Sequence, residues 1–364
     1  GGRRQALVAF SARGAEEARI AQEDLFGIEN SIKAITGYQS GLLDPTLMAA
    51  RAESEKELRA KVAANSEWQK QFGAAWEALG RAQQTYTSFF VRYQLLELPA
   101  GLRASRLFTR ARHLVRLAEE KPKPNEKRLR EYRDSALPSL EQQLFSTAPI
   151  YDSLEIAHLT YSLQLLTEEL GNDQALLEKV LAGRTPAERA EELVRGTGLK
   201  DVAVRKKLAE GGLEAIHASD DAMISFARLI DPDARGVRQR YEDEVESVVR
   251  SQGSLVAKAL FAVRGRTVAP EATFTLRLSY GAVREYTENG KKIPWYTTFR
   301  GLYQRATGQP PYRLPKSFVE KKAALNLDTP FNFVSTADII GGNSGSPVVN
   351  TKGEVVGLIF DSNI

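Results

Sequence analysis

The hydrophobic positions in the first two thirds of the chain follow a helical period. Residues 1 to about 262 predict one amphipathic helix after another, because apolar residues recur every three to five positions with polar residues between them. The first long stretch, AEEARIAQEDLFGIENSIKAITGY, has its apolar stripe at Ile20, Leu25, Ile28, Ile32 and Ile35. We expect this helix to end in the sequence GYQSG, because its glycines interrupt the helical pattern.

Cap residues mark where further helices begin. Asp44 is a candidate N-cap, and Pro45 suits the first helical position, where no backbone N–H is needed. From there the helical pattern could continue for roughly 50 residues unless Gly73 or Gly80 bends it. A threonine followed by proline at 185–186 gives a second start signal of the same kind. This part of the chain therefore predicts a bundle of long helices.

The period changes after residue 262. The stretch TFTLRLSYGAVREYTENGKKIPWYTTF alternates polar and apolar residues and is rich in Thr, Tyr and Phe. It contains ENGKK, a hairpin signal, and SPVVNTKGEVVGLIF predicts a second hairpin that turns at NTKG. We therefore predict an α+β multidomain protein. Residues 1–262 form a large α-helical domain, and residues 263–364 form part of an antiparallel β domain.

Composition narrows the candidate chemistry. The chain has 364 residues, no cysteine, a net charge of +4 and a pI of about 9.0. The absence of cysteine excludes a disulfide scaffold, a thiolate metal site and a cysteine nucleophile. The basic charge is too diffuse to indicate nucleic acid, and no apolar run is long enough to span a bilayer. Both ends break off without a start or stop signal, so we expect a piece of a longer polypeptide.

The sequence GGNSGSPVVN at 341–350 has the features of a nucleophile turn. A catalytic serine needs an exposed hydroxyl, a base, and N–H donors aimed at the developing oxyanion. Ser344 is the candidate nucleophile, and the N–H groups of Gly342 and Ser344 are the candidate oxyanion hole. A strand follows the turn, which favours a chymotrypsin-like arrangement over an α/β-hydrolase elbow. The alternative is a Gly/Ser-rich hairpin loop without chemistry.

The base for this serine is missing from the predicted β domain. The three histidines, His113, His158 and His217, all lie in helical patterns beside apolar neighbours, and none is expected to act as the base. In the chymotrypsin-like chain order, histidine and aspartate precede the serine. We therefore expect both outside this chain. Asn343 stands where trypsin-like enzymes carry an aspartate, so an activation step that needs that ion pair is not expected.

The combination of a helical domain with TADIIGGNSGSPVVNTKGEVVGLIFDSN resembles the dipeptidyl-peptidase 7 and 11 family of bacterial serine exopeptidases. The resemblance extends to TFTLRLSYGAVREY, PWYTTFRGLYQRA and GIENSIKAITGYQSGLLD. It implies a chymotrypsin-like double barrel interrupted by a helical domain that caps the cleft. It also implies release of dipeptides from free peptide N-termini, no cofactor and no metal, a homodimer, and a periplasmic or cell-surface location in a Gram-negative bacterium.

The resemblance assigns roles to individual residues. Ser344 matches the nucleophile and Gly342 the oxyanion position. Asp361 matches the aspartate that binds the substrate's α-ammonium group, and Asn30 matches the asparagine of the helical domain that helps to hold the same amine. Ser362 matches the position that lines the S1 pocket. Family members that prefer apolar P1 residues have glycine there and those that prefer Asp or Glu have arginine, so serine leaves the P1 preference open, with apolar or mixed side chains favoured.

Three interpretations follow from the sequence. The first is a dipeptidyl-peptidase that forms an acyl-enzyme on Ser344 and requires a free substrate amine. The second is a chymotrypsin-like endopeptidase, which would accept blocked N-termini. The third is an inactive protease-like protein whose helical domain serves interactions or chaperoning. Asp338, six residues before Ser344, could indicate a basic P1 preference, but we interpret it as mainly structural.

Overall fold

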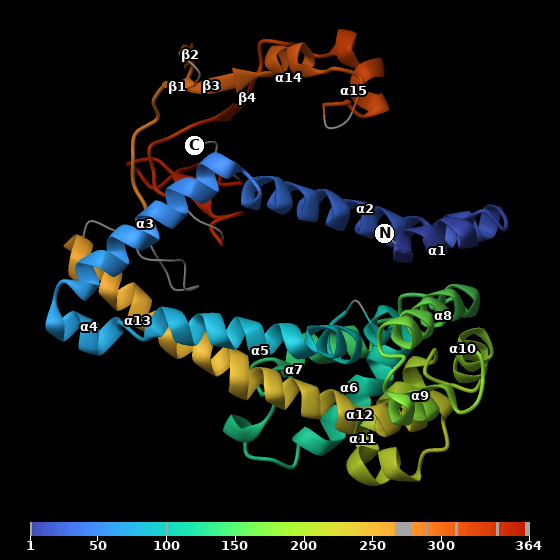
Figure 1. Cartoon of the computed structure of the whole chain (residues 1–364). Helices are drawn as coiled ribbons and strands as arrows, with labels where there is room; N and C mark the ends of the chain where they lie inside the picture. The colour runs from blue at the N-terminus through green and yellow to red at the C-terminus, as the bar shows by residue number, and fades with distance from the viewer. Residues whose placement is uncertain are drawn as a thin grey trace. The chain divides into compact units, whose positions relative to one another are not determined.

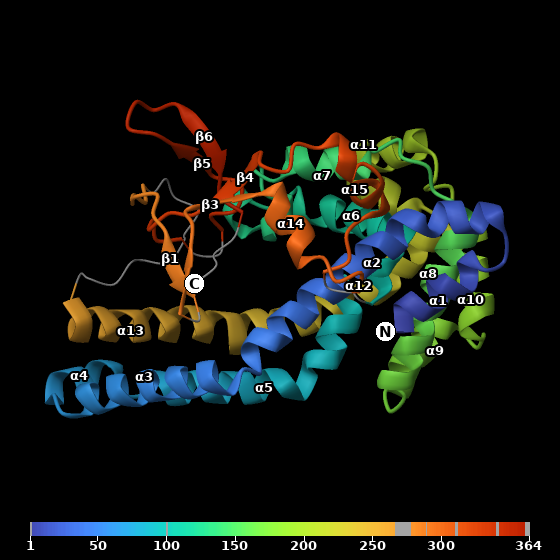
Figure 2. The same ribbon diagram turned by 90° about the horizontal axis from the view of Figure 1, so that it is seen from above.

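The chain divides into two compact units. The computed structural model describes residues 2–99, 101–265, 278–288, 290–309, 312–339 and 342–360. The units are Gly1–Val263, called here the helical unit, and Arg264–Ile364, called the C-terminal unit. The elements described in the helical unit are all helical, and those of the C-terminal unit are short strands and short helices (Figures 1 and 2). The predicted α+β class, with a large helical domain followed by a partial β region, is confirmed.

The α-helices of the helical unit are α1 Gly2–Ser11, α2 Ala15–Leu42, α3 Pro45–Ala63, α4 Ser66–Phe72, α5 Ala75–Leu96, α6 Arg106–Glu120, α7 Leu137–Leu144, α8 Asp152–Glu169, α9 Gln174–Leu181, α10 Pro186–Arg195, α11 Val202–Ala218, α12 Ala222–Tyr241 and α13 Ser247–Arg264. Short 3₁₀ helices are η1 Leu102–Ala104, η2 Asn125–Lys127 and η3 Arg130–Tyr132, and a π-helical turn, η4 Glu242–Glu246, joins α12 to α13. Helix α11 is kinked at Gly212, whose φ is 57°.

The predicted helix starts are confirmed. The Asp44 side chain accepts a hydrogen bond from the Leu47 amide at 2.9 Å, and Pro45 is the first residue of α3. At α10 the Thr185 hydroxyl accepts from the Glu188 amide while the Glu188 carboxylate accepts from the Thr185 amide. This reciprocal capping box satisfies two donors that the helix itself leaves free.

The expected end of α2 at GYQSG is wrong. The helix continues through this sequence to Leu42, and the Leu43 amide still donates to the Gln39 carbonyl at 2.8 Å. A glycine inside a helix costs only about 1 kcal/mol, which the helix tolerates. The actual stop is Asp44, because a residue before proline is pushed out of the helical region.

The stretch after Pro45 forms three helices and not one. Asn65 ends the first part and caps α4, since its side chain accepts from the amides of Glu67 and Trp68 at 3.0 and 3.1 Å. A second break follows at 73–74, before α5. Gly73, one of the two glycines predicted to bend the stretch, thus lies at the second break, whereas Gly80 lies inside α5.

One large core holds the helical unit together. Helix α6 packs against α11 and α12, and α8 packs against α10. The core contains Leu107, Phe108, Leu159, Leu163 and Phe226, each at most 1% exposed. Burying such a side chain contributes about 1.5–3 kcal/mol, so this core supplies most of the stabilisation of the unit.

Two smaller cores lie at the ends of the segment α2–α3. At one end, Leu7 and Phe10 of α1 and Ile20 of α2 pack on Leu154 of α8. At the other end, a cluster of α3, α4 and α13 contains Val62, Phe72 and Ala259. The segment is therefore attached to the unit at both ends through separate apolar contacts.

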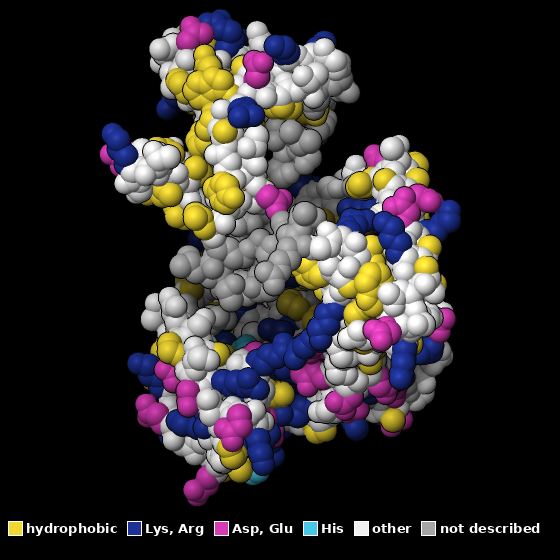
Figure 3. Space-filling model, turned by 90° about the vertical axis from the view of Figure 1, so that its left-hand side faces the viewer, with side chains coloured by type: hydrophobic (Ala, Val, Ile, Leu, Met, Phe, Trp, Pro, Cys, Tyr) yellow, Lys and Arg dark blue, Asp and Glu magenta, His cyan; other side chains and the backbone are white. Residues whose placement is uncertain are grey.

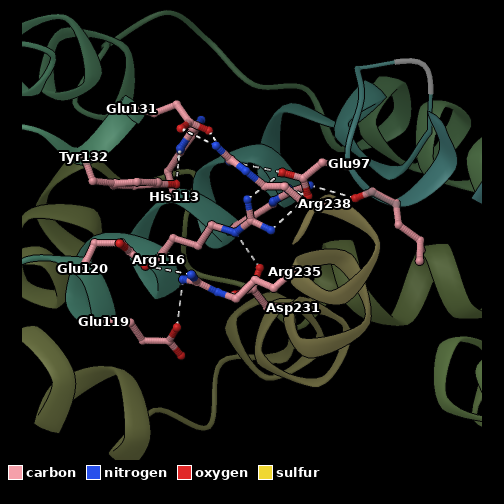
Figure 4. A network of polar contacts seen from close by, with 12 residues as sticks. Glu97, His113, Arg116, Glu119, Glu120, Glu131, Tyr132, Asp231, Arg235 and Arg238 are labelled. Carbon is pink, nitrogen blue, oxygen red and sulfur yellow. Dashed lines mark hydrogen bonds and ion pairs between the residues drawn. The ribbon is translucent and has the colours of Figure 1, made fainter. Parts of the chain in front are cut away.

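A buried ion network crosses the main core (Figure 4). The Arg116 guanidinium contacts Glu97 Oε1 through Nη1 at 2.8 Å and Asp231 Oδ1 through Nε at 2.6 Å. Arg112 also pairs with Glu97, and Arg235 Nε lies 2.5 Å from Asp231 Oδ2. Arg116 is 1% exposed. These pairs join the end of α5 to α6 and α12, and each charge is compensated where water is excluded.

His113 lies beside this network and is held neutral. Its Nδ1 is 3.0 Å from the Tyr132 hydroxyl. Burial, together with the charges of Arg103, Arg112 and Arg116, lowers the pKa of His113 to about 4. Burial raises the pKa of Tyr132, so its hydroxyl keeps its proton and forms a neutral hydrogen bond with the ring nitrogen.

The described residues of the C-terminal unit form three two-stranded antiparallel sheets. They pair β1 Tyr286–Glu288 with β2 Lys291–Ile293, β3 Tyr296–Thr298 with β4 Pro330–Phe333, and β5 Pro347–Val349 with β6 Val355–Leu358. Helices α14 Phe299–Arg305 and α15 Lys316–Glu320 and the 3₁₀ helix η6 Lys322–Ala324 lie between β3 and β4 in the chain. The alternating sequence pattern did not predict these helices.

The two predicted hairpins are present. The first joins β1 to β2 with Glu288 opposite Lys291, and Gly290 has a φ of 74°. The second joins β5 to β6, where the Asn350 amide donates to the Glu354 carbonyl at 3.0 Å and Gly353 has a φ of 79°. Positive φ at both turns explains why glycine stands there.

Removal of Arg116, the central cation of the buried network, is predicted to destabilise the helical unit strongly. Arg116→Met should lower the free energy of unfolding of the helical unit by about 3–5 kcal/mol, because Glu97 and Asp231 lose a buried counter-charge. The matched control is Arg59→Met, which removes an exposed i,i+4 pair with Glu55 and should cost less than about 1 kcal/mol. Urea unfolding followed by circular dichroism measures both, and equal losses would contradict the assignment.

His113 predicts a specific sensitivity to acid. Between pH 6.5 and 4 the unfolded chain binds a proton at this residue that the folded chain does not, so the free energy of unfolding falls as the pH falls. His113→Gln keeps an acceptor for Tyr132 and does not titrate. The wild type should lose up to about 3 kcal/mol more than this variant between pH 7 and 4. Parallel urea titrations at the two pH values test this, and identical losses would show that His113 is not held neutral.

Candidate active site

The turn that carries Ser344 is tied to the end of β6. The Gly345 amide donates to the Ile359 carbonyl at 2.7 Å, and the Ile359 amide donates back to the Ser346 carbonyl at 3.0 Å. The Ser344 hydroxyl lies 3.5 Å from the Phe360 carbonyl oxygen. The side chain of Ser344 is exposed, as a nucleophile requires. The turn and the strand end therefore form one hydrogen-bonded unit.

The backbone around Ser344 has the conformation that its glycines allow. Gly342 has a φ of 103° and Gly345 a φ of 84°, a region that L-residues rarely adopt. Among the residues that the structure describes, no protein oxygen accepts from the amide of Gly342 or Ser344. The described residues therefore offer neither predicted oxyanion donor a protein acceptor. The assignment of the two amides to an oxyanion hole stays a prediction.

The other predicted residues are less completely defined. Asp361 and Ser362 lie outside the described residues. The predictions for these two residues therefore stay predictions. Asn30 is exposed on α2 in the helical unit, and Ser344 belongs to the C-terminal unit. The structure therefore shows Ser344 against Phe360, the last described residue, and it shows Asn30 within its own unit only.

A broad cavity adjoins the strands of the C-terminal unit. Its volume is about 940 Å³, and its apolar wall includes Trp295, Phe331 and Leu358. Ile359 and Phe360, which hydrogen bond to the serine turn, also line it. Hydrophobic side chains gather on this unit in the upper part of Figure 3. The serine turn thus lies at the border of an open apolar surface.

Asp338 also lines this cavity. Its carboxylate is exposed, and its backbone carbonyl accepts a hydrogen bond from the Ser279 hydroxyl at 2.6 Å. The backbone contact joins the segment before the serine turn to residue 279. The interpretation of Asp338 as mainly structural stays a prediction.

All three histidines lie in the helical unit. His113 pairs with buried Tyr132, His158 is buried beside Asp24, and His217 is exposed at the end of α11. The C-terminal unit, residues 264–364, contains no histidine in its sequence. Within the described part of the chain, no group of three or more His, Asp or Glu side chains could hold a metal ion. None of its helices is long and apolar enough to cross a bilayer.

Comparison with known proteins identifies the family. The model of the Peptidase S46 family matches residues 1–364. The chain belongs to the peptidase S46 family. The resemblance to dipeptidyl-peptidases 7 and 11 that the serine turn and the helical segments indicated is therefore confirmed.

Relatives of this S46 chain include two curated enzymes. It is 26% identical over 404 residues to the Asp/Glu-specific dipeptidyl-peptidase of Shewanella putrefaciens, covering 97% of this chain and 53% of that protein. A 105-residue stretch is 42% identical to dipeptidyl-peptidase 7 of Phocaeicola vulgatus, covering 26% of this chain and 15% of that protein. The S46 chain thus spans about half the length of the relative that it matches from end to end.

The fold of this S46 chain is similar to that of a solved structure. DPP11 from Porphyromonas endodontalis in complex with the dipeptide Arg-Glu matches with a TM-score of 0.60 and 18% sequence identity. The match covers 99% of this chain and 53% of the DPP11 chain. At this identity the likeness establishes the fold, and it extends over both units of the sequence.

The strained glycine after Ser344 gives a test of the turn. Gly345→Ala places a Cβ at a φ of 84°, which costs about 1–3 kcal/mol and displaces the turn. In the full-length S46 protein, we expect the rate at which a fluorophosphonate probe labels Ser344 to fall at least about tenfold. Gly353→Ala is the matched control, because it creates similar strain at the far end of the same hairpin. Equal loss of labelling in both variants would contradict a local role for the turn.

Proposed function

We propose that this S46 protein is a serine dipeptidyl-peptidase that releases dipeptides from the free N-termini of oligopeptides. The observation that carries the proposal is the serine turn itself. The Ser344 hydroxyl is exposed on a turn that backbone hydrogen bonds and two positive-φ glycines hold in place. In a chain of a peptidase family, this turn supports Ser344 as the nucleophile.

The chemistry follows from the residues of the turn. Ser344 Oγ attacks the carbonyl carbon of the second peptide bond and gives its proton to a base. The negative charge that develops on the carbonyl oxygen is stabilised by the amides of Gly342 and Ser344. The C–N bond then breaks, the leaving amine takes a proton, and water hydrolyses the dipeptidyl ester of Ser344.

The proposed mechanism requires a base that accepts the proton of Ser344. The C-terminal unit contains no histidine, and the histidines of the helical unit are engaged elsewhere or exposed on a helix. The triad histidine and its aspartate would therefore come from polypeptide outside residues 1–364. Without them, residues 1–364 alone should be inactive, since loss of a triad base costs several orders of magnitude in rate.

Two residues are proposed to select a free N-terminus. Asp361 supplies a carboxylate for the α-ammonium group, and a charge-assisted hydrogen bond of this kind is stronger than a neutral one. Asn30 supplies a second polar contact to the same amine. A substrate whose amine is acetylated loses the charge that Asp361 recognises.

Ser362 is proposed to line the S1 pocket. Its small neutral side chain neither leaves the space of a glycine nor supplies the charge of an arginine. We therefore propose that apolar or mixed P1 side chains are preferred over Asp and Glu. The homodimer and the periplasmic or cell-surface location stay predictions from the family resemblance.

Hydrolysis of a panel of dipeptidyl fluorogenic amides by the full-length protein tests the proposal. Each substrate is assayed with its amine free and acetylated. We expect turnover of free-amine substrates only, and loss of at least about a thousandfold in Ser344→Ala. Asp361→Asn should lower kcat/KM for free-amine substrates at least about tenfold.

The same panel separates the alternatives. Equal cleavage of acetylated and free-amine substrates would contradict the dipeptidyl-peptidase proposal and favour an endopeptidase. Absence of turnover in a folded full-length protein would favour the third interpretation, an inactive protease-like protein that serves interactions. Rates across the P1 side chains measure the contribution of position 362.

A further inference from the structure

The second half of α2 makes little contact with the rest of its unit. Every side chain described between Glu29 and Leu42 is exposed. Asn30 lies at the beginning of this exposed half, only two residues after Ile28, which still packs against the small core of α1, α2 and α8. The direction in which Asn30 points is therefore set by the contacts that hold the first half of the helix.

Apolar contacts alone fix this helix incompletely. Ile20 and Ala21 of α2 pack with Leu7 and Phe10 of α1 and with Leu154 of α8. Hydrophobic burial is non-directional and changes little when a helix turns slightly about its axis. Hydrogen bonds, in contrast, weaken steeply when their angles change. The polar contacts of the first half should therefore decide the rotation of α2.

Asp24 makes these directional contacts. Its Oδ2 lies 2.9 Å from His158 Nε2 on α8, and its Oδ1 lies 3.2 Å from Arg106 Nη2 on α6. Both carboxylate oxygens are thus used, each by a different helix. The Asp24 side chain is 17% exposed and that of His158 2% exposed. This pairing joins α2 to α6 and α8 at one point.

The contact with Arg3 indicates the tautomer of His158. Arg3 Nη2 lies 3.5 Å from His158 Nδ1. A guanidinium can only donate, so Nδ1 accepts and Nε2 carries the proton that is donated to Asp24. Burial acts to raise the pKa of Asp24, but the hydrogen bond from His158 and the charge and hydrogen bond of Arg106 bring it below its usual value. Asp24 therefore stays a carboxylate.

The partners of Asp24 are themselves held in place. The buried Glu155 carboxylate on α8 accepts hydrogen bonds from the Ser105 hydroxyl at 2.7 Å and from the Leu107 amide at 3.0 Å. These bonds fix the beginning of α6, where Arg106 lies, to the same helix that carries His158. Asp24 is thus bound by two side chains on a rigid pair of helices.

We propose that Asp24 is a positioning residue for Asn30: its paired contacts with His158 and Arg106 set the rotation of α2 and thereby the direction in which Asn30 meets the substrate amine. The inference rests on the proposed function for the role of Asn30. Six residues separate the two positions, which is about 9 Å along a helix. A rotation at Asp24 is therefore passed to Asn30 with little loss, and displacement of a binding group by about 1 Å already has a large effect on rate.

A double-mutant cycle in the full-length protein tests this coupling. Asp24→Asn should lower kcat/KM for a free-amine dipeptidyl amide about fivefold to tenfold, mainly through a higher KM. In the Asn30→Ala background the same change should alter kcat/KM less than about twofold, because Asn30 no longer needs to be positioned. Equal effects in the two backgrounds, or no effect of Asp24→Asn, would overturn the proposal.

Glu29→Gln is the matched control. Glu29 carries the same charge, lies closer to Asn30, and pairs with Arg4 at 3.2 Å with both side chains about half exposed. Exposed pairs of this kind contribute little, so kcat/KM should stay within about twofold of the wild type. A loss as large as that of Asp24→Asn would show that any charge change on α2 has the same effect, and would overturn the proposal.

Hydrogen exchange separates this inference from the proposed function. Asp24→Asn should speed amide exchange in the exposed half of α2 and leave α6 and α8 unchanged, whether or not the protein releases dipeptides. If the wild type is inactive and this change is seen, the proposed function fails and the control of α2 by Asp24 stands. Unchanged exchange in α2 would overturn the control of α2 in either case.

Discussion

The helical unit depends on the compensation of one buried cation. Arg116 contacts the carboxylates of Glu97 and Asp231 in a region closed to water, and this joins the end of α5 to α6 and α12. Because each member of the network needs the others for its charge to be tolerated, the three helices have one mutual arrangement that satisfies all of them. The beginning of α6 belongs to the same core. There Arg106 pairs with Asp24 of α2, and the Leu107 amide donates to the Glu155 carboxylate of α8. The contacts proposed to orient α2 are therefore made by this core.

In the C-terminal unit, backbone hydrogen bonds and glycine conformations define the local structure more than side-chain packing does. Its described strands are three or four residues long and pair two by two. The serine turn has two glycines with positive φ and is tied to the end of β6. A hydrogen-bonded turn of this kind defines the position of a hydroxyl without a large core beneath it.

Local signals in the sequence predicted much of this structure. Asp44 and Thr185 cap their helices because a cap depends on residues within one turn, and the two hairpin turns have glycine where positive φ is needed. The end of α2 was misplaced because glycine only weakens a helix, whereas the Asp-Pro pair after it stops one. The contact between Asp24 and His158 could not be predicted, since the two residues lie 134 positions apart. The buried charges of α6 were equally hidden, because their sequence resembles that of a solvated helix.

The hydrogen bonds between the serine turn and the strand end have a consequence for how such a protein changes over time. On the strand side all of them use backbone atoms, the carbonyls of Ile359 and Phe360 and the amide of Ile359. Substitutions of the side chains at and after these positions leave the bonds intact. Under the proposed function, the position of Ser344 and the preference for a substrate can therefore change independently during evolution.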